Sequence, residues 1–532
     1  MSTTRTGWRA GVDVALIVAF LGAIAAPTIR QLTVSDDEAV LREQRKAAER
    51  PELVFEAEAL AEFPRAFERW YGDSFGLRPD LIRWHNRALF EWFDLSPTSE
   101  MTRGRDDWFF TTVADSIPVW RGRKPFLSGE LDVWEEILAD RRAWCASLGA
   151  PYLFVLAPNK STIYPEQMAA RLGPPGRTRM DQLQERLAAS PGPGLFDLRG
   201  VLRQAKERWG GEPIYFPLGT HWNKRGGVIA ANTILTQLSP FVPSIDPWPV
   251  DGFRFQESDR QGDSWATRMY LEDRLRQVNV DWTFPREARA RQVAHPYTKQ
   301  VDILVTEIDD PELPTAVVLH DSFGKMLRPL FAEHFRRCVQ YWTSEFPYEV
   351  IEAERPDVVI HVMTERGLVA VRPTETPLDT PEKLGAEFAA ARDSVLLRVD
   401  RNRGLERLKF FGDLAVASGE AGPSAAARLV QNGPDGGVYL PELEVPDDRW
   451  PLLKIALTAD QPTRLWLEFL TESEPDEYTR RGRGVVRELT AGHNTLWIKL
   501  RVPDLTGRLL VRPAQASNGF VLHGLEVRGV PR

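Results

Sequence analysis

A serine and a histidine about a hundred positions apart are the side chains of this chain best suited to acyl transfer. Ser322 lies in the string His-Asp-Ser-Phe-Gly (320–324), and His221 lies in Gly-Thr-His-Trp-Asn (219–223). A serine hydroxyl is a weak nucleophile at neutral pH unless a base removes its proton, and neutral imidazole is well matched to that task. The two strings therefore predict a nucleophile and its general base.

The segments on either side of Ser322 favour it as the nucleophile. Residues 315–319 form an apolar run typical of a buried strand, and residues 324–335 have the pattern of a helix. A serine at such a junction exposes its hydroxyl above the sheet, with backbone N–H groups nearby to bind an oxyanion. Ser74 and Ser264 also follow Gly-Asp, but neither follows a strand-like run, so we expect both in turns or helix caps.

His221 is predicted to lie on a loop at the edge of the same sheet. Residues 214–216 have strand character, and Asn223 is a good N-cap for a helix over residues 227–235. The histidine then falls on the connection between them. Loops at strand ends in open α/β sheets are where catalytic groups gather.

Six segments of the chain, taken in order, carry a family resemblance. They resemble the alginate O-acetyltransferase family of the AlgJ and AlgX type, whose catalytic domain is a permuted relative of the SGNH (GDSL-type) esterases. The resemblance runs from about residue 40 to about residue 375, and the permutation explains why the histidine precedes the serine. The segments are FPRAFERWYGDSFGLR (63–78), GRDDWFF (104–110), APNKSTIYPE (157–166), THWN (220–223), DSF (321–323) and the stretch from Arg355 to Arg366.

The resemblance implies an O-acetyltransferase that acts on an exopolysaccharide such as alginate. Ser322 would accept an acetyl group from a membrane-bound O-acyltransferase partner, His221 would act as base and then as acid, and a sugar hydroxyl would take the acyl group. Two other functions are open from the sequence. One is a glycan acetyl-esterase, and the other is an inactive glycan-binding scaffold of a polysaccharide export complex.

The chain departs from the family pattern beside the histidine. The family usually carries an aspartate two residues before the histidine, where the carboxylate orients the imidazole, and this chain has Gly219 there. Loss of an orienting carboxylate lowers rates by orders of magnitude. Three explanations stay open: a simpler dyad, a degenerate site, or another acid. The candidate acids are Glu365, Asp321 and Asp263.

Four further residues are candidates for oxyanion or glycan binding. The resemblance places the loop that carries Asn159 and Lys160 at the border of the cleft. Asn159 would supply an oxyanion donor, and Lys160 would meet an anionic glycan. Trp222 and Arg366 are candidates for the same roles. Glu365 and Arg366 end a strand-like run, so they are expected either to line the cleft or to form a structural ion pair.

The N-terminus predicts export. Arg5 and Arg9 precede an almost wholly apolar stretch over residues 14–29. This order is typical of a signal anchor that leaves its basic end in the cytoplasm. A cleaved signal peptide is the rival interpretation, but Pro27 disfavours cleavage, so we expect a single-pass inner-membrane protein with its catalytic domain in the periplasm.

Composition narrows the function further. The 532-residue chain has a formal net charge of -8 with both signs interspersed, which argues against nucleic-acid binding. Its two cysteines, Cys145 and Cys338, lie in helix-like segments, and we expect both to be free and buried. No Cys/His cluster with zinc spacing and no glycine-rich phosphate loop occurs, so we expect no metal and no cofactor.

Helix and strand patterns alternate from residue 127 onward and predict an α/β fold. We expect an SGNH-like three-layer sandwich with a mainly parallel sheet, and a C-terminal β-sandwich of jelly-roll type that is a candidate carbohydrate-binding module. The predicted divisions are a membrane anchor (1–34), a helical N-terminal block (35–125), the catalytic domain (126–376), a linker (377–394) and the β-sandwich (395–532).

Overall fold

The structure is a computed structural model of the chain. It describes residues 4–31, 48–188, 195–209, 211–258, 262–297, 302–343, 345–417, 426–433, 435–476, 478, 484–513 and 518–532.

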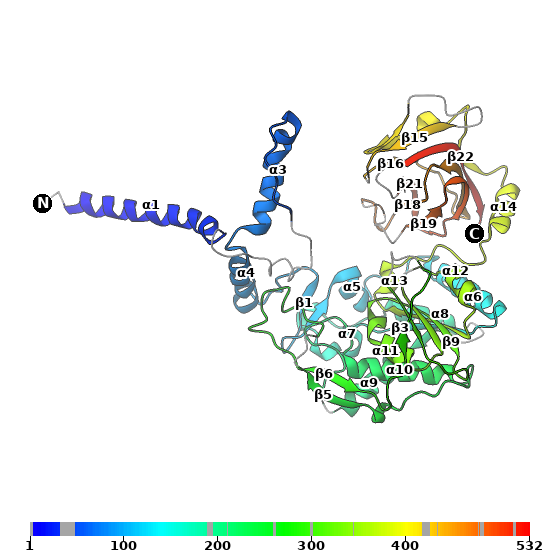
Figure 1. The fold of residues 1–532 in the computed structure, drawn as a ribbon, viewed down its shortest axis with the longest axis horizontal. Helices are drawn as coiled ribbons and strands as arrows, with labels where there is room; N and C mark the ends of the chain where they lie inside the picture. The colour runs from blue at the N-terminus through cyan, green and yellow to red at the C-terminus, as the bar shows by residue number, and fades with distance from the viewer. Residues whose placement is uncertain are drawn as a thin grey trace.

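The centre of the molecule is a seven-stranded mixed sheet with the strand order β4-β3-β11-β9-β10-β8-β7 (Figure 1). The strands from β4 to β10 in this order are parallel, whereas β8 and β7 are antiparallel to their neighbours. The bounds are β3 Tyr152–Ala157, β4 Leu195–Asp197, β7 Arg291–Gln292, β8 Ile303–Glu307, β9 Thr315–His320, β10 Arg337–Trp342 and β11 Val358–Thr364.

Both faces of this sheet are buried, as the apolar runs predict. Successive strand side chains point to opposite faces. Val155 of β3 and Val318 of β9 belong to a core with helices α9 and α10, while Phe154 and Val317 belong to a second core with α6 and α8. The sheet is therefore the middle of three layers. The helices are α6 Glu130–Ser147, α8 Arg179–Ala188, α9 Arg199–Arg208 and α10 Lys224–Leu238.

The structure corrects several expected elements. Residues 214–216 are not a strand and make only an isolated bridge between Tyr215 and Trp222. The helix expected over residues 324–335 is a 3-10 helix, η5 (Ser322–Met326), followed by the short α11 (Arg328–Ala332). Cys338 lies in a strand, but the expectation that both cysteines are free and buried is confirmed.

The C-terminal part contains two antiparallel sheets packed on one core. One sheet has the order β14-β15-β22-β17-β20 with β12 also on β22, and the other has β13-β16-β21-β18-β19. Leu453 and Leu467, one from each sheet, belong to the same buried cluster. The bounds are β12 Val395–Val399, β13 Lys409–Phe411, β14 Leu414–Val416, β15 Ala427–Gln431, β16 Gly437–Tyr439, β17 Arg449–Ala459, β18 Thr463–Thr471, β19 Val485–Leu489, β20 Gly492–Lys499, β21 Leu505–Pro513 and β22 Asn518–Pro531.

Helix α14 (Pro381–Ala390) joins this sandwich to the α/β part. Phe388 of α14 packs in one cluster with Ile137 of α6 and Leu452 of β17. Arg501, only 1% exposed, pairs with Asp379 just before α14. The two parts therefore share an apolar contact and a buried ion pair.

The first helices of the described chain are α1 Thr4–Gln31, α3 Ala57–Ser74 and α4 Arg78–Trp92. Figure 1 shows α1 extending away from the sheets. Among the described residues, no helix combines the length and apolar character needed to cross a membrane. The spanning anchor expected in residues 1–34 is therefore not shown.

Candidate active site

Ser322 lies where β9 ends, at the first position of η5. The Asp321 carboxylate caps η5 by accepting a hydrogen bond of 2.9 Å from the Phe323 N–H. A side chain at Gly324 would place its Cβ 2.2 Å from the His320 ring, so the turn needs glycine there. This tight junction between strand and helix holds the serine at the edge of the sheet, as its flanking segments predict.

His221 lies on a short loop, residues 216–221, which we call the histidine loop. Its ends are joined by a 3.0 Å hydrogen bond from the Phe216 N–H to the His221 carbonyl. Asn223 then begins α10, and its side chain accepts hydrogen bonds from the N–H groups of Arg225 and Gly226. The predicted N-cap is confirmed.

The structure brings the serine and the histidine together. The distance from Ser322 Oγ to His221 Nε2 is 2.9 Å, and His221 Nδ1 lies 2.7 Å from Asp263 Oδ2. An ionised carboxylate only accepts hydrogen bonds, so Nδ1 carries the proton and Nε2 is free to accept one from the serine. The three side chains have the arrangement of a Ser-His-Asp triad.

The Asp263 carboxylate is held in its ionised form. Burial opposes ionisation, but the hydrogen bonds from His221 and from the N–H groups of Thr220 and His221 outweigh it and hold the pKa of Asp263 well below its usual range. Those N–H groups lie 2.6 Å (Thr220) and 3.0 Å (His221) from Oδ2. One carboxylate oxygen therefore fixes both the backbone and the ring of the histidine.

Gly219 makes room for this carboxylate. A Cβ built on Gly219 would lie 2.5 Å from Asp263 Cγ and 2.3 Å from the Asp263 carbonyl oxygen. The position at which the resemblance expects an acid therefore has no side chain, and the space beside it holds an acid from 44 residues further along the chain.

The other two candidate acids have different partners. Glu365 accepts hydrogen bonds from the Asn159 N–H (2.9 Å) and the Thr162 hydroxyl (2.6 Å). Burial raises the pKa of Glu365. Asp321 binds the Phe323 N–H and, through its other oxygen, Thr364. Of the three explanations that the sequence leaves open, the geometry matches the one in which another acid contacts the imidazole, and that acid is Asp263.

Three of the four candidate cleft residues are buried, namely Trp222, Lys160 and Asn159, and the first two have all their polar contacts within the protein. Trp222 is completely buried, and its indole N–H donates to the Phe323 carbonyl at 3.2 Å, so it connects the segment before α10 to η5 and does not face a glycan. Lys160 is 4% exposed and donates to three backbone carbonyls of the histidine loop, so it does not meet an anionic glycan either. Both expectations are corrected by burial.

Asn159 and Arg366 lie together near the serine. The Arg366 guanidinium donates to Asn159 Oδ1 at 3.2 Å. It also stacks on the ring of Phe323, the residue that follows Ser322, at 5.1 Å from the ring centroid. Arg366 is partly exposed, and burial lowers its pKa while Asp321 and Asp263 oppose that effect.

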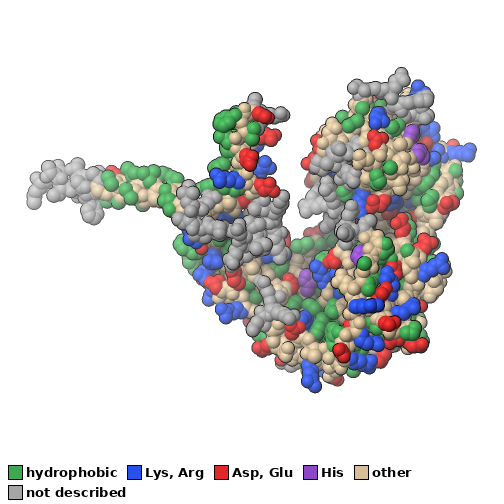
Figure 2. All heavy atoms as spheres, in the orientation of Figure 1, with side chains coloured by type: hydrophobic (Ala, Val, Ile, Leu, Met, Phe, Trp, Pro, Cys, Tyr) green, Lys and Arg blue, Asp and Glu red, His purple; other side chains and the backbone are tan. Residues whose placement is uncertain are grey.

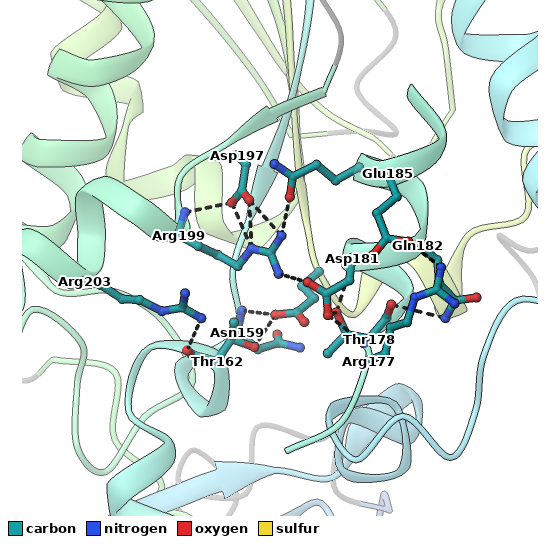
Figure 3. A network of polar contacts seen from close by, with 12 residues as sticks. Asn159, Thr162, Arg177, Thr178, Asp181, Gln182, Glu185, Asp197, Arg199 and Arg203 are labelled. Carbon is teal, nitrogen blue, oxygen red and sulfur yellow. Dashed lines mark hydrogen bonds and ion pairs between the residues drawn. The ribbon is translucent and has the colours of Figure 1, made fainter. Parts of the chain in front are cut away.

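A cavity of about 440 Å³ is lined by Thr162 and by residues of the polar network drawn in Figure 3. Its charged residues have structural roles: Asp197 accepts from the backbone N–H of Arg199 at the start of α9, and Asp181 accepts from the N–H of Thr178 at the start of α8. The Arg199 side chain pairs with both aspartates.

Sequence reasoning missed Gln277, which supports the histidine loop from outside. Its side chain accepts from the Leu218 N–H at 2.9 Å and donates to the Asp263 carbonyl at 3.0 Å. It thereby holds the loop and the segment that carries Asp263 at a fixed distance. A lone glutamine outside any motif carries no signal for this role.

The part of the chain that carries these three side chains is similar to an SGNH hydrolase-like domain. Residues 101–323 match the family model described as "SGNH hydrolase-like domain, acetyltransferase AlgX". The matched range contains His221, Asp263 and Ser322. It confirms the family resemblance for these residues and is narrower than the range of about 40 to 375 that the sequence segments suggested.

Solved structures provide a second comparison. The O-acetyltransferase domain of Pseudomonas putida AlgJ is 16% identical, with 55% of this chain and 99% of that chain covered and a TM-score of 0.36. Pseudomonas aeruginosa AlgX is 10% identical, with 84% and 98% covered and a TM-score of 0.30. The CBM22-1 xylan-binding domain of Paenibacillus barcinonensis Xyn10C is 13% identical, with 26% and 96% covered and a TM-score of 0.21. No curated protein sequence matches the chain.

Proposed function

We propose that this protein is an O-acetyltransferase that moves acetyl groups onto hydroxyls of an exopolysaccharide through an acetyl-serine intermediate. The observation that carries the proposal is the hydrogen-bonded series Ser322, His221 and Asp263, with distances of 2.9 and 2.7 Å. It lies within a domain of the AlgX acetyltransferase type.

In the first half-reaction, Ser322 Oγ attacks the carbonyl carbon of an acetyl donor while its proton passes to His221 Nε2. Asp263 stabilises the resulting imidazolium through the hydrogen bond to Nδ1. The tetrahedral intermediate collapses as the donor's leaving oxygen takes the proton from Nε2. An acetyl ester on Ser322 and a free donor alcohol result.

In the second half-reaction, a sugar hydroxyl attacks the acetyl-serine. His221 accepts the hydroxyl proton and returns it to Ser322 Oγ as the ester breaks. The products are the acetylated sugar and the free Ser322 hydroxyl. Water in place of the sugar would give the esterase reaction, so exclusion of water decides between the two activities.

We assign oxyanion binding to Asn159 and Arg366. The support is their mutual hydrogen bond and the stacking of Arg366 on Phe323, next to the nucleophile. The Phe323 N–H is already engaged by Asp321, so it is not free for this role. A side-chain amide and a guanidinium are both donors suited to a developing negative charge.

The location and the donor follow from the resemblance and the N-terminal helix. We place the catalytic domain in the periplasm, with a membrane-bound O-acyltransferase as the acetyl donor. The side chains of Val14, Ile17, Phe20 and Leu21 on α1 are more than half exposed, which supports attachment of this helix to a membrane. Cell fractionation of the full chain and of a chain in which a cleavable signal peptide replaces α1 tests this placement: the second chain is expected in the soluble periplasmic fraction.

The experiment that tests the function is intact-mass analysis after incubation with an activated acetyl ester. Wild type is expected to gain one acetyl group, which then leaves when an acceptor oligosaccharide is added. Ser322→Ala is expected to gain none. Equal acetylation of both proteins would contradict the acyl-enzyme, and loss of the group at the same rate with and without any acceptor would favour the esterase.

A further inference from the structure

The buried ammonium of Lys160 donates hydrogen bonds to three backbone carbonyls of the histidine loop. Lys160 Nζ lies 2.8 Å from the Phe216 carbonyl, 2.8 Å from the Pro217 carbonyl and 2.6 Å from the Gly219 carbonyl. An ammonium has three N–H donors, and here each has a backbone acceptor. These three carbonyls lie within the five residues that precede His221.

Two aromatic rings also lie near this ammonium. The rings of Trp108 and Phe110 lie 5.4 and 5.1 Å from Nζ, within the range of cation–π attraction. Lys160 is the first residue of α7 (Lys160–Ile163) and comes three positions after the last residue of β3, so its backbone lies close to the end of that strand. The lysine thus connects the end of β3 to the histidine loop, which contains no strand.

We propose that Lys160 is a positioning residue for the acetyl-transfer site: its ammonium holds residues 216–219 so that the next residues, Thr220 and His221, keep their contacts with Asp263 and Ser322. This inference rests on the proposed function.

The position of Gly219 shows why such a restraint matters here. An aspartate at position 219 would tie the loop and the imidazole through one residue. In this chain the acid is Asp263. The alignment of His221 therefore depends on a fixed distance between the histidine loop and the segment that carries Asp263. Lys160 holds one of them through the Gly219 carbonyl, directly beside the space that the Asp263 carboxylate occupies.

Charge supports the same role. Burial lowers the pKa of the Lys160 ammonium to about 7, and the Asp263 carboxylate opposes this lowering. When the ammonium loses its proton it keeps two N–H donors, so one of the three carbonyl contacts is lost along with the charge. The loop is then held less firmly above neutral pH.

The test compares Lys160→Met with wild type in the hydrolysis of an activated acetyl ester. Methionine keeps the length and apolar stem of the side chain but donates no hydrogen bond. We expect kcat to fall by about 10- to 100-fold, the effect of a misplacement near 1 Å, with KM within about twofold of wild type. Loss through KM alone, or an unchanged kcat, would overturn the proposal.

Lys206→Met is the matched control. Lys206 also donates to a backbone carbonyl, that of Ile163 at 3.0 Å, and also lies over an aromatic ring, that of Tyr164 at 4.7 Å. Its contacts lie outside the histidine loop. We expect its kcat to equal that of wild type, and a loss as large as that of Lys160→Met would assign the effect to general destabilisation and overturn the proposal.

The pH profile supplies a readout that a merely structural lysine would not change. In wild type kcat is expected to fall as pH rises through about 7, because the ammonium is lost there. Lys160→Arg keeps its charge at all these pH values and is expected to lack this descending limb. The same descending limb in both proteins would contradict the assignment.

If Lys160→Met does not fold, the wild-type protein still decides. In protein labelled with ¹⁵N-lysine, the Lys160 ammonium is expected to exchange slowly with water because all three of its N–H donors are buried and hydrogen-bonded, whereas fast exchange would overturn the proposal. Failure of the proposed function looks different: Ser322→Ala would then hydrolyse the ester as fast as wild type, whatever the Lys160 variants do.

Discussion

At the scale of single residues, the site depends on one carboxylate oxygen with several partners. Asp263 Oδ2 accepts hydrogen bonds from the His221 ring and from the N–H groups of Thr220 and His221. These contacts fix the imidazole tautomer and the loop backbone at once. A small displacement of Asp263 therefore disturbs both the base and the loop that carries it.

Gly219→Ala is expected to lower the rate of acetylation of Ser322 by about 100-fold, because the added Cβ would meet the Asp263 backbone and carboxylate and push them from the histidine. Gly200→Ala is the matched control, since a Cβ there meets nothing within 4 Å. Quenched-flow mass analysis measures both rates. Equal rates for Gly219→Ala and wild type would contradict the packing argument.

The buried lysine predicts that stability and activity change with pH in opposite directions. The pKa of Lys160 is near 7 in the folded protein against an ordinary value of 10.5, so between these pH values the unfolded chain binds one more proton. The free energy of unfolding from this group then rises by about 1.4 kcal/mol per pH unit. Urea denaturation at pH 7, 8 and 9 measures the free energy of unfolding of wild type and of Lys160→Met. The difference between the two proteins should change with pH, and a constant difference would contradict the buried charge.

The sequence alone predicted some residues of the site and not others. Ser322 and His221 are recognisable because their local flanks dictate a strand end and a helix cap. Asp263 was one of three candidate acids, because nothing local shows that residues 42 apart meet. Lys160 was assigned to the cleft surface, since a sequence does not show that three backbone carbonyls converge on one side chain.

At the scale of elements, helix α10 positions the histidine from its N-terminal end. The Asn223 side chain accepts from two N–H groups of α10 and donates to the Pro213 carbonyl at 2.6 Å. Asn223 therefore caps the helix and also holds the two ends of the segment 213–223, which contains the histidine loop, next to each other.

Asn223→Ala is expected to lower the free energy of unfolding by about 1–2 kcal/mol through loss of the cap. Asn223→Asp keeps an acceptor for the helix but cannot donate to Pro213, so it should be less destabilised. Thermal and urea unfolding measure the order wild type, Asp, Ala. If Asn223→Ala were as stable as wild type, the cap would contribute nothing.

Elements were predicted best where their apolar pattern is long and local. Strand β9 follows the predicted run over residues 315–319 closely, and helix α10 contains the predicted helix over residues 227–235. Strands β4 and β10 were missed, and residues 214–216 were wrongly predicted as a strand because an apolar run of three is equally compatible with a buried loop. Their burial beside Trp222 depends on tertiary contacts that no local pattern shows.

At the scale of the whole molecule, the β-sandwich is joined to the α/β part by a buried ion pair. Arg501 Nη1 lies 2.5 Å from Asp379 Oδ2, and its Nε lies 3.1 Å from Glu136 of α6. The Asp379 side chain is only 8% exposed, so removal of Arg501 would leave a nearly buried charge without its main partner.

Arg501→Met is expected to destabilise the junction by about 3–5 kcal/mol. Limited proteolysis should then cut near residues 371–394 faster than in wild type. Arg508→Met, which removes an exposed pair with Glu442, is the control and should leave the cleavage rate unchanged. Equal cleavage of Arg501→Met and wild type would mean that the junction does not depend on this pair.

The most direct test of the account is the rate at which Ser322 becomes acetylated in Asp263→Asn. Asparagine keeps the shape of the side chain but removes the charge and favours the wrong imidazole tautomer, so a loss of about 10⁴-fold relative to wild type is predicted, with Asp251→Asn on the surface unchanged. If Asp263→Asn acetylated Ser322 as fast as wild type, Asp263 would not be the acid that replaces the one absent at position 219, and the triad would be contradicted.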